Sequence, residues 1–337
     1  MKSTALKTLI CLFTLPVIFS FAEAQIQQEP STVFDMLYGD EPVEVSIFTD
    51  FEQLDSLRNT NEYQAAALAF EYKDTESKWG IKLRTRGKFR RRICNQPPLK
   101  LNFDKDDLVA YGLQKDDELK LVTQCVPGYL GKDYVLREYL TYQLYNILSP
   151  HSFRAQLVKL EYNCTSTGKK EKSWGIILED KNTLERRLDS EKCGDCYGRL
   201  REEFDEQSLG RATLFQYMIA NADYSLNQAR NLEFFRNKES GKLFVAPYDF
   251  DFSGLVNTSY ALPNPDYQQK RVRDRVFLGH SSDEQLAETI AYFKEKKSEI
   301  MAYVDDAKYL AKGSRRDIER YIESFYDSLD KGLVRPK

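Results

Sequence analysis

Two carboxylates, Asp249 and Asp251, lie two residues apart in the segment VAPYDFDFSGLVNTSYA (residues 245–261), which is otherwise apolar and aromatic. A predicted strand over residues 242–245 leads into this segment, and alternate residues of a strand point to the same face. The two acids therefore face either water or a shared ligand. Carboxylate oxygens are hard ligands, and the cations that they suit are Mg²⁺ and Mn²⁺.

Two further oxygen-bearing side chains, Asp223 and Asn231, precede this segment. Asp223 follows a predicted buried helix over residues 206–222, and Asn231 opens a predicted strand over 231–237. That strand and residues 241–249 form a predicted hairpin. The far end of the hairpin, with its two acids, therefore returns to the rim on which the upstream pair lies.

These four side chains allow a catalytic interpretation and a structural one. In the catalytic one, Asp223 orients an acceptor hydroxyl while Asn231 and Asp249 hold a metal, as in the centre of a kinase. The H-R-D and D-F-G sequences of ordinary kinases are absent. In the structural one, Asp223 caps a turn while Asp249 and Asp251 cap the next segment. Spacing alone leaves both open.

A basic segment, KLRTRGKFRRRICNQPPLKLNF (residues 82–103), offers cations for a phosphate. Arg84 and Arg86 alternate on a predicted strand, Lys100 lies inside the next strand, and Lys120 is placed similarly in LKLV. Arginine binds phosphate through paired hydrogen bonds, and lysine binds it as a point charge. The alternatives are a solvated charged face and a surface for an acidic partner.

A helix predicted over residues 133–148 carries Glu138 among apolar residues at helical spacing. Glu138 is expected either to pair with Lys100 or Lys120 or to remain a surface charge. Glu179 follows the strand WGIIL, where it either belongs to the same site or begins the next helix.

Two differently built parts of the chain must position these residues. After a loose segment over 25–42, residues 43–130 are rich in short strands, and residues 131–337 combine helices with hairpins. This order predicts an α+β protein of two lobes divided near Gly128 and Gly131. A cleft between lobes is a common place for a ligand.

The first 24 residues have the features of a cleavable export signal. Lys2 and Lys7 precede an apolar run over residues 9–21, and residues 22–24 (AEA) fit the small-x-small cleavage rule. We therefore expect a secreted or periplasmic protein. No later segment has eighteen apolar residues, so no membrane span is expected after cleavage. The formal net charge of −3 gives no reason to expect a nucleic-acid partner.

Five cysteines follow the predicted cleavage site, and an oxidising compartment favours disulfides between them. Cys94 and Cys125 flank the lysine-bearing strands and are predicted to pair. Cys193 and Cys196 form a C-x-x-C sequence that suits a local disulfide, a metal site or redox chemistry. An odd number leaves at least one thiol over, and Cys164 is the cysteine outside these two pairs.

Taken in order, these segments resemble the CotH family, named for a spore coat protein with an atypical protein-kinase-like fold. The resemblance spans roughly residues 43–260. It is carried by KLRTRGKFRRR, PLKLNF, LKLV with YVLREYLTYQLYN, GIILED, MIANADYSLNQARNLEFF and FVAPYDFDFSG. It implies an exported bacterial protein that uses ATP and Mg²⁺ or Mn²⁺ to phosphorylate a hydroxyl acceptor such as a protein serine or threonine.

The resemblance also implies a role for each candidate residue. Asp223 is the catalytic acid; Asn231, Asp249 and Asp251 lie at the metal; Arg86, Lys100 and Lys120 face the phosphates; Glu138 and Glu179 are further matches. The chain has no clear glycine-rich nucleotide loop, and export takes it where ATP is scarce. The alternative is therefore an inactive kinase-fold protein that binds an anionic ligand or takes part in cell-envelope assembly.

Overall fold

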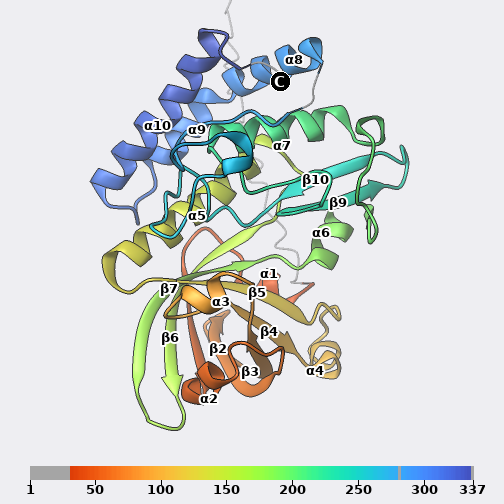
Figure 1. Cartoon of the computed structure of the whole chain (residues 1–337). Helices are drawn as coiled ribbons and strands as arrows, with labels where there is room; N and C mark the ends of the chain where they lie inside the picture. Colours follow the sequence, from red (N-terminus) through yellow and green to blue (C-terminus); the bar gives the residue numbers. More distant parts are fainter. Residues whose placement is uncertain (1–30, 280–281, 335–337) are drawn as a thin grey trace, which may run out of the picture.

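The computed structural model describes residues 31–279 and 282–334 (Figure 1). The predicted export signal, residues 1–24, lies outside the described residues. Part of the segment that was expected to be loose forms helix α1 (Val33–Leu37). Thr32 caps this helix by accepting a hydrogen bond of 3.1 Å from the backbone N–H of Asp35. Its apolar residues are buried in the core of the first sheet, which explains why this short segment is ordered as a helix.

Seven strands form a closed barrel: β1 (Val43–Thr49), β2 (Gln64–Tyr72), β3 (Thr75–Thr85), β4 (Leu99–Phe103), β5 (Glu118–Thr123), β6 (Ala155–Cys164) and β7 (Lys170–Leu178). Their order around the barrel is β1-β2-β3-β4-β5-β7-β6. Neighbours are antiparallel, except that β1 and β6 pair in parallel and close the barrel.

The interior of the barrel is filled by alternate side chains. In β3, for example, Trp79, Ile81 and Leu83 are buried, while the residues between them are exposed. This follows from the period of two in a strand. Short helices lie in three of the connections: α2 (Phe51–Ser56), α3 (Arg90–Ile93) and α4 (Lys105–Ala110).

The hairpin of β6 and β7 completes the barrel, although it lies beyond residue 130. Ala155 is opposite Leu178 at one end of this hairpin, and β7 also pairs with β5. The strand-rich part predicted over residues 43–130 therefore shares its sheet with a later hairpin. Local sequence predicts that a hairpin forms, but it does not say which sheet the hairpin joins.

Helix α5 (Gly128–Leu148) connects β5 to β6 and lies between the barrel and the helices of the C-terminal part (Figure 1). It begins five residues before the predicted start at residue 133. Its buried residues include the charged Asp133, Arg137 and Glu138. Because both the barrel and the C-terminal part cover α5, its charged residues are enclosed along with its apolar ones.

A second sheet has three strands, β8 (Ser190–Lys192), β9 (Leu232–Asn237) and β10 (Leu243–Pro247), in the order β10-β9-β8. The antiparallel β9 and β10 are the predicted hairpin. Helix α6 (Lys181–Arg187) precedes β8, and α7 (Glu206–Met218) packs on β10 (Figure 1). Two single turns of 3-10 helix are η1 (Arg201–Glu203) and η2 (Pro265–Tyr267).

Three helices end the described chain: α8 (Asp283–Glu295), α9 (Lys297–Asp305) and α10 (Lys312–Asp330). They share a second hydrophobic core with α5, α7 and the second sheet, into which α10 places Ile318, Ile322 and Phe325. None of the helices in residues 31–279 and 282–334 has both the length and the apolar character needed to cross a membrane.

Candidate functional site

Asp223 and Asn231 are in direct contact. Helix α7 ends at Met218, and the side chain of Asn221 then accepts a hydrogen bond of 2.9 Å from the backbone N–H of Asp223. The amide nitrogen of Asn231 donates to the backbone carbonyl of Asp223 at 2.6 Å and to its carboxylate at 3.1 Å. The amide oxygen of Asn231 is therefore turned away from Asp223.

Asp249 follows the end of β10, and hydrogen bonds fix both its own backbone N–H and that of the preceding residue, Tyr248. Its N–H donates a hydrogen bond of 2.9 Å to the hydroxyl of Tyr142 in α5. The N–H of Tyr248 donates at 3.0 Å to the backbone carbonyl of Asn231. The hairpin thus brings Asp249 back beside Asn231.

Both Asn231 and Asp249 have left-handed backbones, with φ of 56° and 63°. This conformation is uncommon for residues other than glycine, and asparagine and aspartate adopt it more readily than other side chains, mostly in turns. Two of the three residues predicted to lie at the metal, Asn231 and Asp249, therefore share this turn-like backbone.

The carboxylates of Asp223 and Asp249 are close enough to influence each other. Burial raises the pKa of Asp223 above its ordinary value, and the negative charge of Asp249 adds to the effect. The guanidinium of Arg230, 3.7 Å from the Asp223 carboxylate, opposes it. Asp223 is thus a partly buried acid with one cation, one amide and a second acid around it.

Asp251 and Glu138 meet at a third residue, Arg90, which the sequence analysis did not single out from its basic segment. Nη1 of Arg90 lies 3.4 Å from Oδ2 of Asp251 and 3.6 Å from Oε2 of Glu138. Glu138 is buried on Arg90, so both interpretations that the sequence left open, a pair with Lys100 or Lys120 and a surface charge, are wrong. Burial raises the pKa of both carboxyls, and the positive charge of Arg90 opposes the shift.

Lys120 faces the same region from the barrel. Its Nζ lies 4.7 Å from the centre of the Tyr248 ring. Burial and, to a smaller extent, the nearby charge of Arg86 lower the pKa of Lys120 to about 8, whereas the charge of Asp249 opposes the shift. Arg86 and Lys120 therefore share an electrostatic environment with Asp249.

Lys100 is opposite Lys120 in the sheet but is already paired. Its Nζ lies 2.6 Å from the carboxylate of Glu118. Glu179 has a structural environment, because its buried carboxylate binds Arg154 at 2.9 Å and Arg187 at 3.0 Å. The structure therefore places neither Lys100 nor Glu179 in contact with the Asp223–Asn231 pair.

Both predicted cysteine pairs are at disulfide distance. Cys94 is bonded to Cys125, and Cys193 is bonded to Cys196, so the C-x-x-C sequence forms the local disulfide. Cys164 is the free cysteine among the described residues.

The donor set suits a metal that is bound partly by its substrate. Among the residues that the structure describes, no three side chains of His, Cys, Asp or Glu converge to hold an ion. Asn231 and Asp249 instead offer one amide oxygen and one carboxylate. Mg²⁺ is commonly held by one or two carboxylates together with substrate phosphates and water, so these residues fit such an ion.

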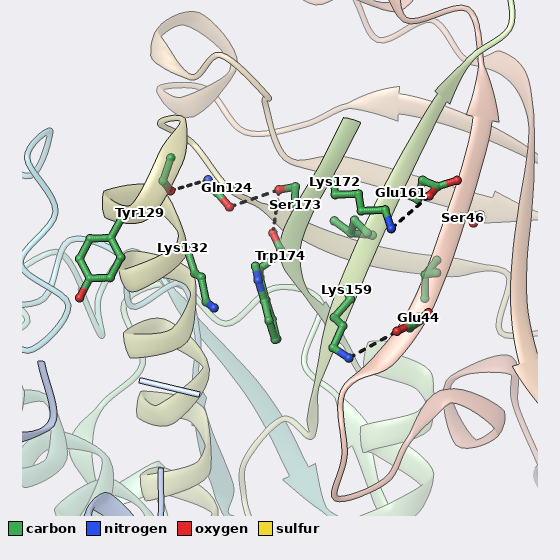
Figure 2. A pocket seen from close by; sticks show the side chains of 13 residues that line it. Glu44, Ser46, Gln124, Tyr129, Lys132, Lys159, Glu161, Lys172, Ser173 and Trp174 are labelled. Atoms are coloured by element: carbon green, nitrogen blue, oxygen red, sulfur yellow. Dashed lines mark hydrogen bonds and ion pairs between the residues drawn. The ribbon is translucent and has the colours of Figure 1, made fainter. Parts of the chain in front are cut away.

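A separate cavity of about 440 Å³ lies on the outer face of the barrel beside the start of α5 (Figure 2). Lys132 lies over the ring of Trp174 at 4.6 Å. Two ion pairs cross the opposite side of the cavity, Lys159 with Glu44 and Lys172 with Glu161. None of the predicted site residues lines this cavity.

No family model matches the chain, and no curated protein matches it. Two solved structures are similar at low TM-scores. The proinflammatory kinase CtkA of Helicobacter pylori has a TM-score of 0.40 and 9% identity, over 68% of this chain and 90% of that one. The Golgi casein kinase has a TM-score of 0.31 and 9% identity, over 87% and 74%. Both neighbours are kinases, but similarity this low does not bear on the roles of individual residues.

Proposed function

We propose that the protein is a metal-dependent phosphotransferase with a two-lobed, kinase-like fold that moves a phosphoryl group from a nucleoside triphosphate to a hydroxyl. The observation that carries the proposal is the grouping of Asp223, Asn231 and Asp249. The first two are hydrogen-bonded, the second and third have left-handed backbones, and the charge of the third acts on the first.

In this proposal Asp249 and the amide oxygen of Asn231 hold Mg²⁺ or Mn²⁺. The ion supplies positive charge that neutralises the phosphates. Asp251, which follows closely, keeps its carboxylate on Arg90 and supports the turn. The contact of Asn231 with Asp223 fixes the amide, so its oxygen is directed before any ligand arrives.

Asp223 orients the acceptor hydroxyl and accepts its proton. Its raised pKa makes it a stronger base than a fully solvated aspartate, which helps general-base catalysis. Its side chain is about two-fifths exposed, so an acceptor can reach it.

Lys120 and Arg86 bind the phosphates. Burial makes the charged form of this lysine unfavourable in the free protein. A bound anion therefore stabilises the charged form more than it would stabilise a fully solvated lysine. Such preorganised cations stabilise the charge that is redistributed during transfer. The acceptor class we propose is a protein serine or threonine, on a substrate or envelope partner outside the cytoplasm.

A second candidate function is a non-catalytic module that binds an anionic ligand or a partner protein in the cell envelope. One observation favours it: the connection between β1 and β2, residues 50–63, contains no glycine that could let a backbone approach phosphates. Lys120 and Arg86 would then bind the anion without transfer.

The test is binding of Mn²⁺–ATP, measured by thermal shift and calorimetry on the wild type and on Asp249→Ala. We expect the wild type to be stabilised by several degrees, in line with about 3 kcal/mol at a hundredfold excess over the Kd. Asp249→Ala should lose this stabilisation. Asp327→Ala, an exposed acid on α10, is the matched control and should retain it. A wild type without any shift favours the binding module.

A further inference from the structure

Arg90 joins three separate segments around the candidate site. Its residue exposure is only 8%, although Phe89 and Ile93 beside it are exposed. Its Nη2 donates a hydrogen bond of 3.2 Å to the carbonyl of Thr123 at the end of β5. Its Nη1 reaches Glu138 of α5 and Asp251 beyond β10, as described above.

These contacts connect Arg90 directly to the turn that carries Asp249. Asp251 lies two residues beyond Asp249, and both Asp251 and Glu138 are 2% exposed. Arg90 is the cation that ion-pairs with both of them within the described residues. Without that cation the two buried acids would either repel each other or take up protons, and in both cases the link that Arg90 makes between the turn and α5 would be lost.

The position of Arg90 depends in turn on a very short helix. α3 has four residues, and so short a helix is not stable by itself. Cys94 caps its C-terminal end, where the N–H of Cys94 donates at 3.0 Å to the carbonyl of Arg90. The disulfide joins Cys94 to Cys125, two residues beyond Thr123, and the N–H of Asn95 donates at 2.9 Å to the carbonyl of Cys125.

The disulfide and the guanidinium therefore bind the same two segments, α3 and the end of β5. We propose that the Cys94–Cys125 disulfide holds Arg90 in place as a positioning residue, so that the Asp249 turn becomes fully competent only after the two cysteines are oxidised. This inference rests on the proposed function, since the turn it controls is the proposed metal-binding turn.

The redox step is an ordinary thiol–disulfide exchange. The thiols of Cys94 and Cys125 lose two protons and two electrons, and one disulfide forms between them. The oxidant is a disulfide of a small thiol or of an oxidoreductase, which is reduced to two thiols. Such oxidants are present in oxidising compartments outside the cytoplasm, whereas the cytoplasm keeps thiols reduced. The site would thus bind metal and nucleotide weakly before export and at full affinity after it.

The experiment measures the Kd of Mn²⁺–ATP by calorimetry on oxidised wild type, Cys94→Ser/Cys125→Ser, Arg90→Gln and the triple variant. Loss of a group that orients a metal ligand commonly costs 10–100-fold in affinity, so we expect about tenfold weaker binding in both the double serine variant and Arg90→Gln. The triple variant should bind no more weakly than Arg90→Gln, because both changes remove the same support. Cys193→Ser/Cys196→Ser is the matched control and should bind like the wild type.

Hydrogen exchange at residues 249–252 gives a readout that needs no nucleotide. We expect faster exchange there in Arg90→Gln and in the double serine variant than in the control. If the double serine variant does not fold, Cys193→Ser/Cys196→Ser, which keeps Cys94–Cys125 as its disulfide among the described residues, is compared in its oxidised and reduced forms by the same two measurements.

The outcomes separate this inference from the proposed function. If oxidised wild type does not bind Mn²⁺–ATP, the proposed function fails, and exchange at residues 249–252 still tests the link from disulfide to turn. If the wild type binds and the variants bind equally well, the inference is overturned while the proposed function stands. Additive losses in the triple variant would also overturn it, because the disulfide would then act by a route other than Arg90.

Discussion

The hydroxyl of Tyr142 accepts a hydrogen bond of 2.9 Å from the backbone N–H of Asp249. Tyr142 is 2% exposed, and its ring packs against Phe250 with 4.7 Å between the ring centres. The middle of α5 is therefore tied to the turn at Asp249 by one polar and one aromatic contact. Any displacement of α5 should alter the geometry of that turn.

Tyr142→Phe should remove the hydrogen bond to this turn while keeping the aromatic packing against it. The variant keeps the ring but leaves the partly buried N–H of Asp249 without its partner, so we expect the free energy of unfolding to fall by about 1–2 kcal/mol. Mn²⁺–ATP should also bind several-fold more weakly, because the left-handed conformation of Asp249 loses a support. Urea denaturation and calorimetry measure the two effects.

Tyr326→Phe is the matched control for this variant. Tyr326 is also buried, and its hydroxyl donates to the carbonyl of Phe293, far along the chain from the candidate site. It should cost similar stability and leave Mn²⁺–ATP affinity unchanged. Equal affinities in Tyr142→Phe and the wild type would show that the Tyr142 contact does not support the Asp249 turn.

Lys120→Met should make the free protein more stable at pH 7 while weakening nucleotide binding. Burial lowers the pKa of Lys120 to about 8, whereas an unfolded lysine has a pKa of about 10.4. Between these values the unfolded chain binds more protons, so wild-type stability gains from this group as pH rises from about 8 to 10. At pH 7 the variant avoids the whole penalty, roughly 1–3 kcal/mol in the free energy of unfolding.

Urea denaturation at pH 7 and pH 10 checks both the sign and the window. The advantage of Lys120→Met over the wild type should shrink between the two values. Lys172→Met, in which an exposed lysine of β7 is replaced, should show no such change. A Lys120→Met protein that is less stable than the wild type at pH 7 would mean that the lysine is already stabilised by the acids near it.

Cys164 should react as a thiolate at mildly acidic pH. Hydrogen bonds with Ser166, at 3.3 Å, and with Thr167 lower the pKa of the Cys164 thiol to about 6. The rate of alkylation by iodoacetamide should therefore have its midpoint near pH 6, as followed by peptide mass spectrometry under non-reducing conditions. Denatured protein should give a midpoint near 8.5, and Ser166→Ala should move the native midpoint toward it. A native midpoint that matches the denatured one contradicts the prediction.

The sequence predicted the parts of this site that depend on local pattern. The hairpin of β9 and β10, the buried α7 and the disulfide of Cys94 with Cys125 follow from alternation, helical spacing and flanking positions. The nearness of Asp249 to Asn231 follows from the hairpin's return to its starting rim.

The parts that depend on long-range packing could not be predicted in the same way. Arg90 is one of five basic residues within seven positions, and nothing in that run shows that it alone turns inward. In the sequence, Tyr142 looks like any other aromatic residue of a core helix. Its role depends on the hydrogen bond between its hydroxyl and Asp249, a residue that is distant in the chain. The entry of β6 and β7 into the barrel likewise depends on β1, more than a hundred residues earlier, through the pairing of Val43 with Val158.

Asp223→Asn should abolish transfer while leaving nucleotide binding intact, because it keeps the size and the hydrogen bond with Asn231 but cannot accept a proton. General-base catalysis contributes about 10²–10⁴-fold, so kcat for phosphorylation of an acceptor peptide should fall by that factor with an unchanged Kd for Mn²⁺–ATP.

In the wild type, kcat should rise with pH through the pKa of Asp223, which lies above the ordinary aspartate value. Arg230→Gln removes the cation that lowers this pKa, so it should move the acidic limb to higher pH without changing the plateau. A limb that stays in place in Arg230→Gln would assign the titration to another group, and an Asp223→Asn protein with wild-type kcat would remove Asp223 from the mechanism.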